Sequence, residues 1–274
     1  MWQAIYTLFA VLVLILAGLH LLFLARFTKL SAALETSILN TPAPVTVMEG
    51  IPEIVYAFAL RAGVSPDKLA RSVSLEQSAE IKLSRGSAWQ PIAANQSIST
   101  MQAGFVWEAR QTIGPITKFR VIDAYVDGVG RLQANLLGSI PVANAVGGEL
   151  NRGELMRYLA ELPWAPDALL GNTALRWKII DTGEVEVSIL HEDGPVSVRL
   201  IFNNAGDIVE MRAKDRPARE ADNTLVMRDW RGFFSDYGMI GGRRIPLRGE
   251  VGYLYDGEYD AYWRGRITKY KTNQ

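Results

Sequence analysis

The sequence predicts an α+β protein. An N-terminal transmembrane helix is expected to precede a large curved antiparallel β-sheet or incomplete barrel, which holds an inserted central helix. Three observations predict this class. Residues 2–25 are apolar, most of the later chain alternates apolar and polar side chains, and one helical stretch near residues 151–162 interrupts that alternation. We expect an anchor at residues 1–29, a linker at 30–50 and a single domain at 51–274.

The apolar N-terminal run contains no Asp, Glu, Lys or Arg between residues 2 and 25. At about 1.5 Å per residue such a helix is about 36 Å long, which suffices for a hydrocarbon core of about 30 Å. A cleavable signal peptide is disfavoured because the run is long, lacks a basic n-region and precedes no small-x-small cleavage site. A single-pass anchor is therefore expected. Arg26 and Lys29 only weakly favour a cytoplasmic domain, so its side of the membrane stays open.

Composition narrows the possible partners and cofactors. The formal net charge is zero and both signs are interspersed, which argues against nucleic acid. The absence of cysteine excludes disulfides, thiolate catalysis and cysteine-bound metal centres. The two histidines are His20, inside the apolar run, and His191. We predict no cofactor and no metal site.

A helix at about residues 51–63 is expected to open the domain. Pro52 suits the first turn, Glu53 complements the helix dipole, and Gly63 suits the position after the C-terminus. From Ser72 the apolar period changes from 3.6 to 2, and tight turns separate the alternating runs. Ten to twelve antiparallel strands are expected, and open sheets of that size tend to curl or close.

The central stretch, residues 136–170, is helical in pattern between strand-like flanks. Asn151 is the expected N-cap, with Glu154 three residues later as in a capping box. One apolar stripe follows at helical spacing, and Pro163 and Pro166 are expected to end the helix. The stripe consists of Leu155, Tyr158, Leu159 and Leu162.

The sequence contains no G-x-S-x-G, H-E-x-x-H or P-loop pattern. Gly128 and Gly130 lie between two strand-like runs and indicate a turn rather than a dinucleotide loop. His191 is followed by Glu192 and Asp193, which is typical of a solvated hairpin turn. A pair of carboxylates could carry acid–base chemistry, but the sequence does not bring two of them together.

Aromatic residues are frequent in or beside the expected elements, and most such side chains pack in a core. A curved sheet lined with them can also enclose an apolar ligand. On that hypothesis Trp107 and Trp177 form the wall, Trp164 forms the rim, and arginines meet a ligand carboxylate or phosphate. No catalytic residue is predicted. The predicted ligand-binding residues are Trp107, Arg110, Arg131, Arg157, Tyr158, Glu161, Trp164 and Trp177.

Four segments, at residues 105–110, 136–170, 176–181 and 231–251, resemble an uncharacterised bacterial family of membrane-associated proteins. The most specific part is R-Y-L-x-E-L-x-W-x-P at residues 157–166, and the resemblance extends over about residues 51–270. It implies a bacterial protein of the cytoplasmic membrane and carries no known activity. The expected architecture, many antiparallel strands with one inserted helix, looks like the half-barrels of bacterial lipoprotein carriers.

Three functions remain open at this stage. The preferred one is a non-enzymatic, membrane-anchored protein that binds a lipid or another apolar molecule in its curved sheet. The first alternative is a hydrolase that uses carboxylates in the same cavity. The second is a structural or interaction domain whose core is filled. An apolar cavity would favour the binding protein, and convergent carboxylates in a cleft would favour the hydrolase. A solid core would favour the structural or interaction domain.

Overall fold

The structure, a computed structural model, describes residues 2–41, 50–220 and 224–274. Its helices are α1 (Trp2–Leu39), α2 (Glu53–Arg61), α3 (Glu149–Ala160) and α4 (Ala168–Gly171), with a short 3-10 turn η1 (Leu162–Trp164) between the last two. Its strands are β1 (Ser72–Ile81), β2 (Gln90–Ser99), β3 (Phe105–Ile113), β4 (Ile116–Val126), β5 (Val129–Leu136), β6 (Ile140–Val146), β7 (Arg176–Asp181), β8 (Glu184–His191), β9 (Gly194–Phe202), β10 (Ile208–Arg219), β11 (Leu225–Ile240), β12 (Arg243–Tyr255) and β13 (Glu258–Asn273).

All these strands form one antiparallel sheet, in the order β6-β5-β4-β3-β2-β1-β13-β12-β11-β10-β9-β8-β7. The predicted α+β class with a long apolar N-terminal helix, a large open antiparallel sheet and an inserted helix is therefore confirmed. The described residues contain thirteen strands, slightly more than the ten to twelve expected. Tight turns join most sequence neighbours, whereas the contact of β1 with β13 joins the two ends of the domain.

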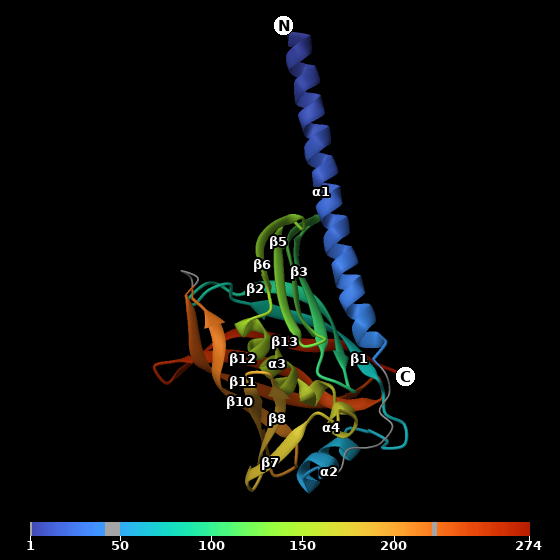
Figure 1. Cartoon of the computed structure of the whole chain (residues 1–274), viewed down its shortest axis with the longest axis vertical. Coiled ribbons are helices and arrows are strands. Elements are labelled where there is room, and N and C mark those ends of the chain that lie inside the picture. The colour runs from blue at the N-terminus through green and yellow to red at the C-terminus, as the bar shows by residue number, and fades with distance from the viewer. Residues whose placement is uncertain (1, 42–49, 221–223) are drawn as a thin grey trace.

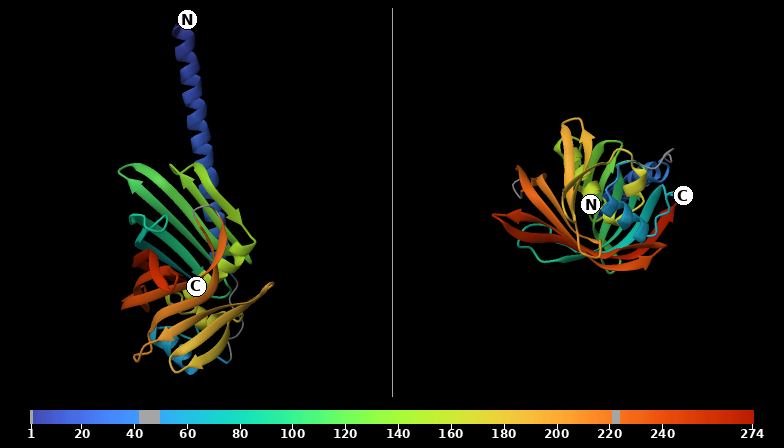
Figure 2. Two further views of the ribbon diagram at one scale, coloured as in Figure 1. Left: turned by 90° about the vertical axis from the view of Figure 1, so that its left-hand side faces the viewer. Right: turned by 90° about the horizontal axis from the view of Figure 1, so that it is seen from below.

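The sheet curves into an open arc, and α3 lies in its hollow (Figures 1 and 2). The edges of the arc are β6 and β7, and the segment that contains α3 connects them. α3 consequently contacts β4, β5 and β6 on one half of the arc and β8, β9 and β10 on the other. Each residue of the predicted apolar stripe, from Leu155 to Leu162, is at most 1% exposed. The helix thus builds the main core of the domain.

The start of α3 corrects one prediction, because Asn151 is not the N-cap. The helix begins at Glu149, after Gly148, whose φ of +60° suits glycine. Asn151 instead accepts a hydrogen bond of 2.8 Å from the backbone N–H of Gly130 in β5. Glu154 closes no capping box and lies buried beside Arg216 of β10. The predicted pattern failed because contacts with the sheet, rather than local capping, decide where these side chains point.

The helix α1 runs on without a break to Leu39, through the first ten residues of the segment expected as a linker. The remaining linker residues 42–49 lie outside the described part of the chain. The C-terminal half of α1 packs on the convex face of the sheet, where Phe27 and Ile38 join Val106 and Ile122 in a small apolar cluster. The N-terminal half of α1 is apolar and exposed, and the helix as a whole is long and apolar enough to cross a membrane (Figure 1).

Candidate functional site

A cavity of about 750 Å³ lies between α3 and the concave face of the sheet. α3 therefore leaves part of the hollow unfilled. Much of the wall is aromatic and comes from elements far apart in the sequence. The aromatic lining residues include Trp107, Trp164, Trp230, Tyr253, Tyr262 and Trp263.

Trp164 is fixed in this wall by contacts on several sides. Its indole N–H donates a 2.9 Å hydrogen bond to the carbonyl oxygen of Pro246. Its ring packs edge-to-face on Phe234 and Trp263, with centroids 5.5 and 6.0 Å away. A Cβ atom at Gly249 would lie 2.7 Å from the Trp164 ring, so glycine in the middle of β12 makes room for the indole. The wall is therefore rigid at this point.

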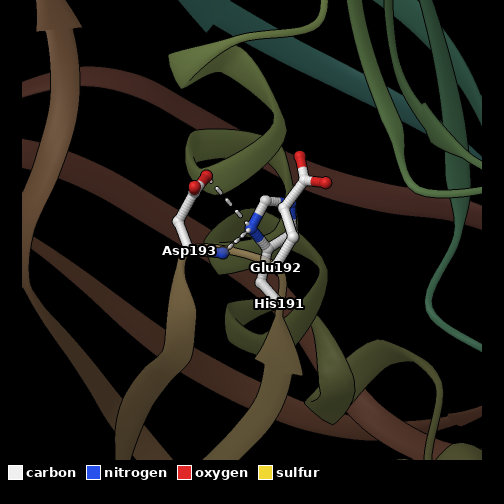
Figure 3. A group of neighbouring side chains, drawn as sticks. All are labelled: His191, Glu192 and Asp193. Carbon is white, nitrogen blue, oxygen red and sulfur yellow. Dashed lines mark hydrogen bonds and ion pairs between the residues drawn. The ribbon is translucent and has the colours of Figure 1, made fainter.

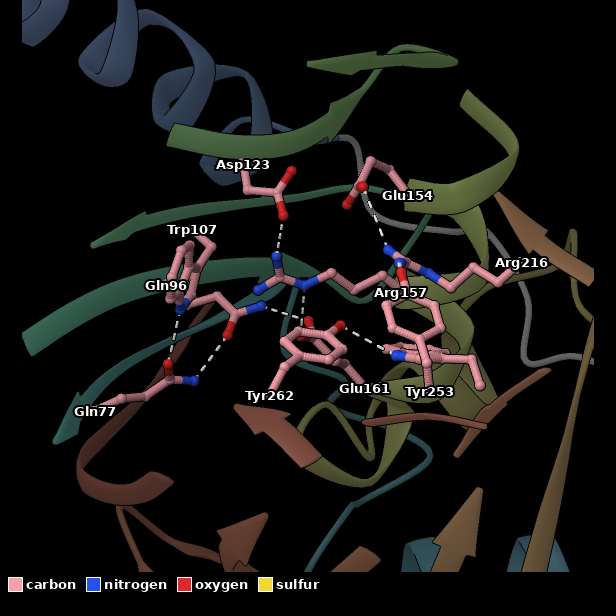
Figure 4. Close-up of polar contacts among 11 residues, drawn as sticks. Gln77, Gln96, Trp107, Asp123, Glu154, Arg157, Glu161, Arg216, Tyr253 and Tyr262 are labelled. Carbon is pink, nitrogen blue, oxygen red and sulfur yellow. Dashed lines mark hydrogen bonds and ion pairs between the residues drawn. The ribbon is translucent and has the colours of Figure 1, made fainter. Parts of the chain in front are cut away.

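The polar part of the cavity is organised around Arg157, on the inner side of α3 (Figure 4). Its guanidinium donates to Glu161, with Nε 2.9 Å from Oε1, and also to Asp123 of β4. The rings of Phe105 and Trp107 lie 4.8 and 5.0 Å from the same group. Two carboxylates and two aromatic rings thus hold one charged group in a single position.

A chain of neutral donors extends this arrangement along the wall (Figure 4). The Trp107 indole donates to Gln77 at 2.8 Å, Gln77 donates to Gln96 at 3.0 Å, and Gln96 donates to Glu161. Both oxygens of the Glu161 carboxylate are therefore hydrogen-bonded. A chain with its partners filled in this way keeps its geometry, so these groups form a preformed surface.

A second buried pair, Glu154 and Arg216, also lines the cavity and lies near this group (Figure 4). Arg216 Nη2 lies 3.5 Å from Glu154 Oε1, and Nη1 donates to the Tyr253 hydroxyl. The guanidinium also lies 4.5 Å from the centroid of Trp230. Tyr253 in turn stacks on Tyr262 with centroids 5.2 Å apart.

Three polar atoms of this cluster are buried and have no hydrogen-bond partner among the described residues. They are Oδ1 of Asp123, Oε2 of Glu154 and Nε of Arg216. Buried polar groups are normally hydrogen-bonded, and each exception requires an explanation. The exceptions here lie on three side chains that all line the cavity. A ligand or water could satisfy them after small side-chain shifts.

The charge balance of the cluster depends on Glu154. Burial, and to a smaller extent the negative charge of Asp123, raise the pKa of Glu154 to about 8. The positive charges of Arg216 and Arg157 act in the opposite direction but are outweighed. Glu154 is therefore mostly protonated at neutral pH. The two guanidiniums then balance the carboxylates of Asp123 and Glu161, and the Glu154 carboxyl is available as a hydrogen-bond donor.

Four of the predicted ligand-binding residues line the cavity: Trp107, Arg157, Glu161 and Trp164. Arg157 and Glu161 form the i,i+4 pair that their spacing allows, but the pair is buried inside the domain rather than solvated on its surface. The side chains of the two residues are only 15% and 11% exposed.

The other four predicted residues are not brought to the cavity. Arg110 and Arg131 lie one position away from the concave residues Ala109 and Leu132, so the alternation of strand side chains directs them to the convex face. Tyr158 is fully buried, donates to the Ser99 carbonyl at 3.2 Å and accepts from Asn172 at 2.9 Å. Trp177 lies half-buried on the edge strand β7.

Sequence reasoning did not single out Asp123, Glu154, Arg216, Tyr253 or Tyr262 as site residues. One of them left a usable signal. Asp123 lies two residues from both Val121 and Tyr125, so it is a charged residue on an otherwise apolar face of its strand. Arg216 left no such signal in the sequence, because a register shift in β10 near this residue interrupts the alternation of its side chains.

His191, Glu192 and Asp193 gather at the β8–β9 turn (Figure 3). Nδ1 of His191 accepts a hydrogen bond of 3.3 Å from the backbone N–H of Asp193 and lies 3.5 Å from its carboxylate. Both acids are exposed. This is the hairpin turn that the sequence predicts at His191, and its polar groups belong to the turn.

The profile of a family described as "Family of unknown function (DUF6544)" matches residues 45–265. No curated protein matches the chain. Among solved structures, it is similar to a LolA superfamily protein from Nitrosomonas europaea, with 9% identity and a TM-score of 0.43 over 80% of this chain and 94% of that one. It is also similar to a putative outer membrane lipoprotein-sorting protein domain from Vibrio parahaemolyticus, with 9% identity and a TM-score of 0.45 over 80% and 91%.

Proposed function

We propose that this chain, which belongs to the DUF6544 family of unknown function, is a membrane-anchored protein that holds an apolar ligand inside its curved sheet. The observation that carries the proposal is the cavity of about 750 Å³ between α3 and the sheet. Its volume is within the range of about 300–1,000 Å³ that is usual for small-molecule sites, and such sites combine apolar walls with a few fixed polar groups. A lipid is the class of ligand that a membrane-anchored protein meets first.

The arrangement of the walls indicates how such a ligand would lie. Its apolar body would pack against Trp164 and Trp263, whereas its polar end would meet Asp123, Glu154 and Arg216. The unpartnered atoms of these three residues would then gain hydrogen bonds. Because the cluster is close to neutral when Glu154 is protonated, it suits a polar end that both donates and accepts hydrogen bonds.

Packing of α1 supports an uncleaved anchor, and the membrane that we propose for it is a bacterial cytoplasmic membrane. Phe27, Ser31 and Ile38 are buried against the sheet, and Ser31 donates to Glu108 of β3. Removal of the helix would expose the apolar cluster that these residues complete. Within the apolar run itself, His20 contacts Ser139 and Leu24 lies beside Gly138. A cleaved signal peptide makes no contact with the mature fold, so these contacts favour a permanent single-pass helix. The side of the membrane that the domain occupies stays open.

Binding can be tested with the full chain in lipid nanodiscs, by titrating fluorescent apolar probes and fatty acyl ligands. We expect saturable binding. Leu132 lines the cavity on β5, so Leu132→Trp should fill part of it and weaken binding about tenfold, which corresponds to about 1.4 kcal/mol. Leu190→Trp is the matched control, because Leu190 is 79% exposed on β8. It should bind as the wild type does.

Trp164→Ala removes a wall residue that is also packed and hydrogen-bonded in the fold. The substitution should weaken binding as well as lower stability, whereas Trp177→Ala should leave binding unchanged. If no ligand binds saturably, the binding proposal is wrong. If Trp164→Ala then lowers only stability, an interaction domain is the better explanation.

Convergence of Asp123 and Glu154 favours a second candidate, a hydrolase. A buried carboxyl group whose pKa is raised can act as a general acid near neutral pH, and the raised pKa of Glu154 fits this role. Wild-type chain should then hydrolyse esters of apolar acids, and Glu154→Gln should lower kcat by about 10²–10⁴-fold while binding persists. If the protein only binds its ligand, the wild-type chain should show no ester hydrolysis.

A further inference from the structure

Two β-hairpin turns at the end of the sheet next to α1 are apolar and exposed. Residues 113–116 form the β3–β4 turn, and residues 136–140 form the β5–β6 turn. Neither turn contains a charged residue. Ile113 and Ile116 are 62% and 59% exposed, and Leu137 and Ile140 are 47% and 50% exposed. Clustered exposed apolar side chains indicate a contact surface.

Several turns elsewhere in the sheet have a different composition. Acidic residues occupy the turns at residues 127–128, 181–184, 191–194, 203–207 and 256–257. The turn at 127–128 joins the same strands, β4 and β5, at their opposite ends. The apolar character therefore belongs to one end of these strands and is not a general property of the fold.

Contacts with α1 fix the level of the apolar turns along the helix. Nδ1 of His20 lies 2.6 Å from the Ser139 hydroxyl, in the β5–β6 turn. At the adjacent Gly138, an added Cβ atom would lie 3.2 Å from a methyl carbon of Leu24. The turn thus touches α1 between His20 and Leu24, and Figure 1 shows the tips of β3, β5 and β6 beside the middle of the helix.

That level coincides with the expected surface of the membrane. The part of α1 before His20, residues 2–19, is about 27 Å long at about 1.5 Å per residue. A hydrocarbon core is about 30 Å thick, so it would extend to the level of His20 or slightly beyond. A bilayer that α1 crosses therefore reaches the β5–β6 turn.

Charged groups begin at the same level on the helix and on the sheet. Arg26 and Lys29 are the first charges on α1. On the sheet, Arg120 donates to Glu108 at 2.7 Å and to Thr28 of α1 at 3.3 Å. Lys118 lies closer to the tips, and its amine reaches Gln90 of β2 at 3.4 Å. Such a long side chain can place its charge in the headgroup layer.

We propose that the β3–β4 and β5–β6 turns insert into the membrane surface beside α1, so that this end of the curved sheet faces lipid. The inference rests on the proposed function in one respect, namely that α1 is an anchor. It adds a second membrane contact, made by the domain itself, and fixes the orientation of the domain against the bilayer.

This orientation gives the cavity a route to the lipid phase. In the β4–β5 pair, Phe119 lies opposite Leu136 of the apolar turn. Phe119 and Val121 are half-buried apolar residues that pack against the main core, and Val121 also lines the cavity. An apolar surface thus leads from the turn to the cavity. A ligand could move along it between the bilayer and the site without crossing water.

The absence of cysteine makes a direct test possible. Ile116→Cys and Leu137→Cys each place one thiol on an apolar turn, where an environment-sensitive fluorophore can be attached. Ile179→Cys is the matched control, because Ile179 is 68% exposed on β7, at the opposite end of the domain (Figure 1). All three are exposed positions, so the fold should tolerate the label. The full chain is reconstituted in phosphatidylethanolamine–phosphatidylglycerol vesicles that contain lipids brominated on the acyl chain.

We expect bromolipids to quench the labels at positions 116 and 137, and aqueous iodide to quench the label at 179. Equal iodide quenching at all three positions, in protein that floats with the vesicles, would overturn the inference and leave the anchor intact. Failure of the protein to float would remove the anchor and this inference together. Probe binding to the cavity, measured on the same samples, reports separately on the proposed ligand site.

Discussion

The carboxylate of Asp167 and the guanidinium of Arg243 form a two-point ion pair, with Nε–Oδ2 and Nη2–Oδ1 distances of 2.8 Å each. Asp167 is fully buried and also accepts a 2.9 Å hydrogen bond from the backbone N–H of Ala70. The pair fastens the segment after α3 to β12. It thereby holds Trp164, three residues earlier, in the wall of the cavity.

Asp167→Asn should therefore destabilise the domain strongly. The substitution leaves the Arg243 charge without its partner, and the loss of one partner of a buried pair costs about 3–5 kcal/mol. Unfolding in urea, followed by tryptophan fluorescence of the full chain in nanodiscs, measures the change. Asp236→Asn is the matched control, because Asp236 pairs with Arg266 on the surface, where such pairs contribute about 0–1 kcal/mol. Equal effects of both substitutions would contradict the structural role of the buried pair.

Leu159→Ala should show the importance of α3 to the core. Leu159 is completely buried in the hollow of the sheet, and removal of such a side chain costs about 2–5 kcal/mol. The free energy of unfolding is measured in the same way. Leu190→Ala, at a position that is 79% exposed, should change it by less than about 0.5 kcal/mol. A similarly small loss for Leu159→Ala would mean that α3 does not support the core.

Glu154 should make stability fall as pH rises. Burial first, and the charge of Asp123 second, raise the folded-state pKa of Glu154 to about 8, whereas an unfolded glutamate has a pKa of about 4.3. Between these values the unfolded chain binds fewer protons than the folded one. The contribution of Glu154 is thus complete below about pH 4.3 and is lost as pH rises through about 8.

Glu154→Gln removes this titration and leaves a neutral side chain among Asp123, Glu161, Arg157 and Arg216. The difference in unfolding free energy between the variant and the wild type should therefore shift in favour of the variant between about pH 5 and about pH 9. Urea unfolding at both pH values measures it. Parallel behaviour of the two proteins would show that Glu154 titrates normally in the fold.

The helix α1 should keep the full chain in the membrane fraction through washes with carbonate and high salt. Its N-terminal half is apolar and exposed, and its C-terminal half packs on the sheet. Fractionation followed by N-terminal sequencing tests this expectation. Most of the protein in the soluble fraction, or a new N-terminus near residue 30, would contradict the anchor.

The sequence by itself determined the elements whose signals are local. An uncharged run predicted the long apolar part of α1, and 3.6-residue spacing predicted that Leu155 and Leu159 are buried. Period-two alternation predicted strands, and the polar residues from His191 to Asp193 predicted the hairpin turn between β8 and β9. Because a strand alternates its side chains, the sequence also held the information that Arg110 lies on the face opposite Trp107 and that Arg131 lies on the face opposite Leu132.

Only the tertiary structure decided which of these faces meet across the hollow. Asp123 comes from β4, Glu154 from α3 and Arg216 from β10, and the last two are 62 residues apart. Local periodicity assigns a side chain to one face of its own strand, but the curvature of the sheet decides which side chains lie opposite each other. That curvature follows from the pairing of β1 with β13 and from the passage of α3 between the two edges. Both are long-range contacts, and the charged cluster exists only once they have formed.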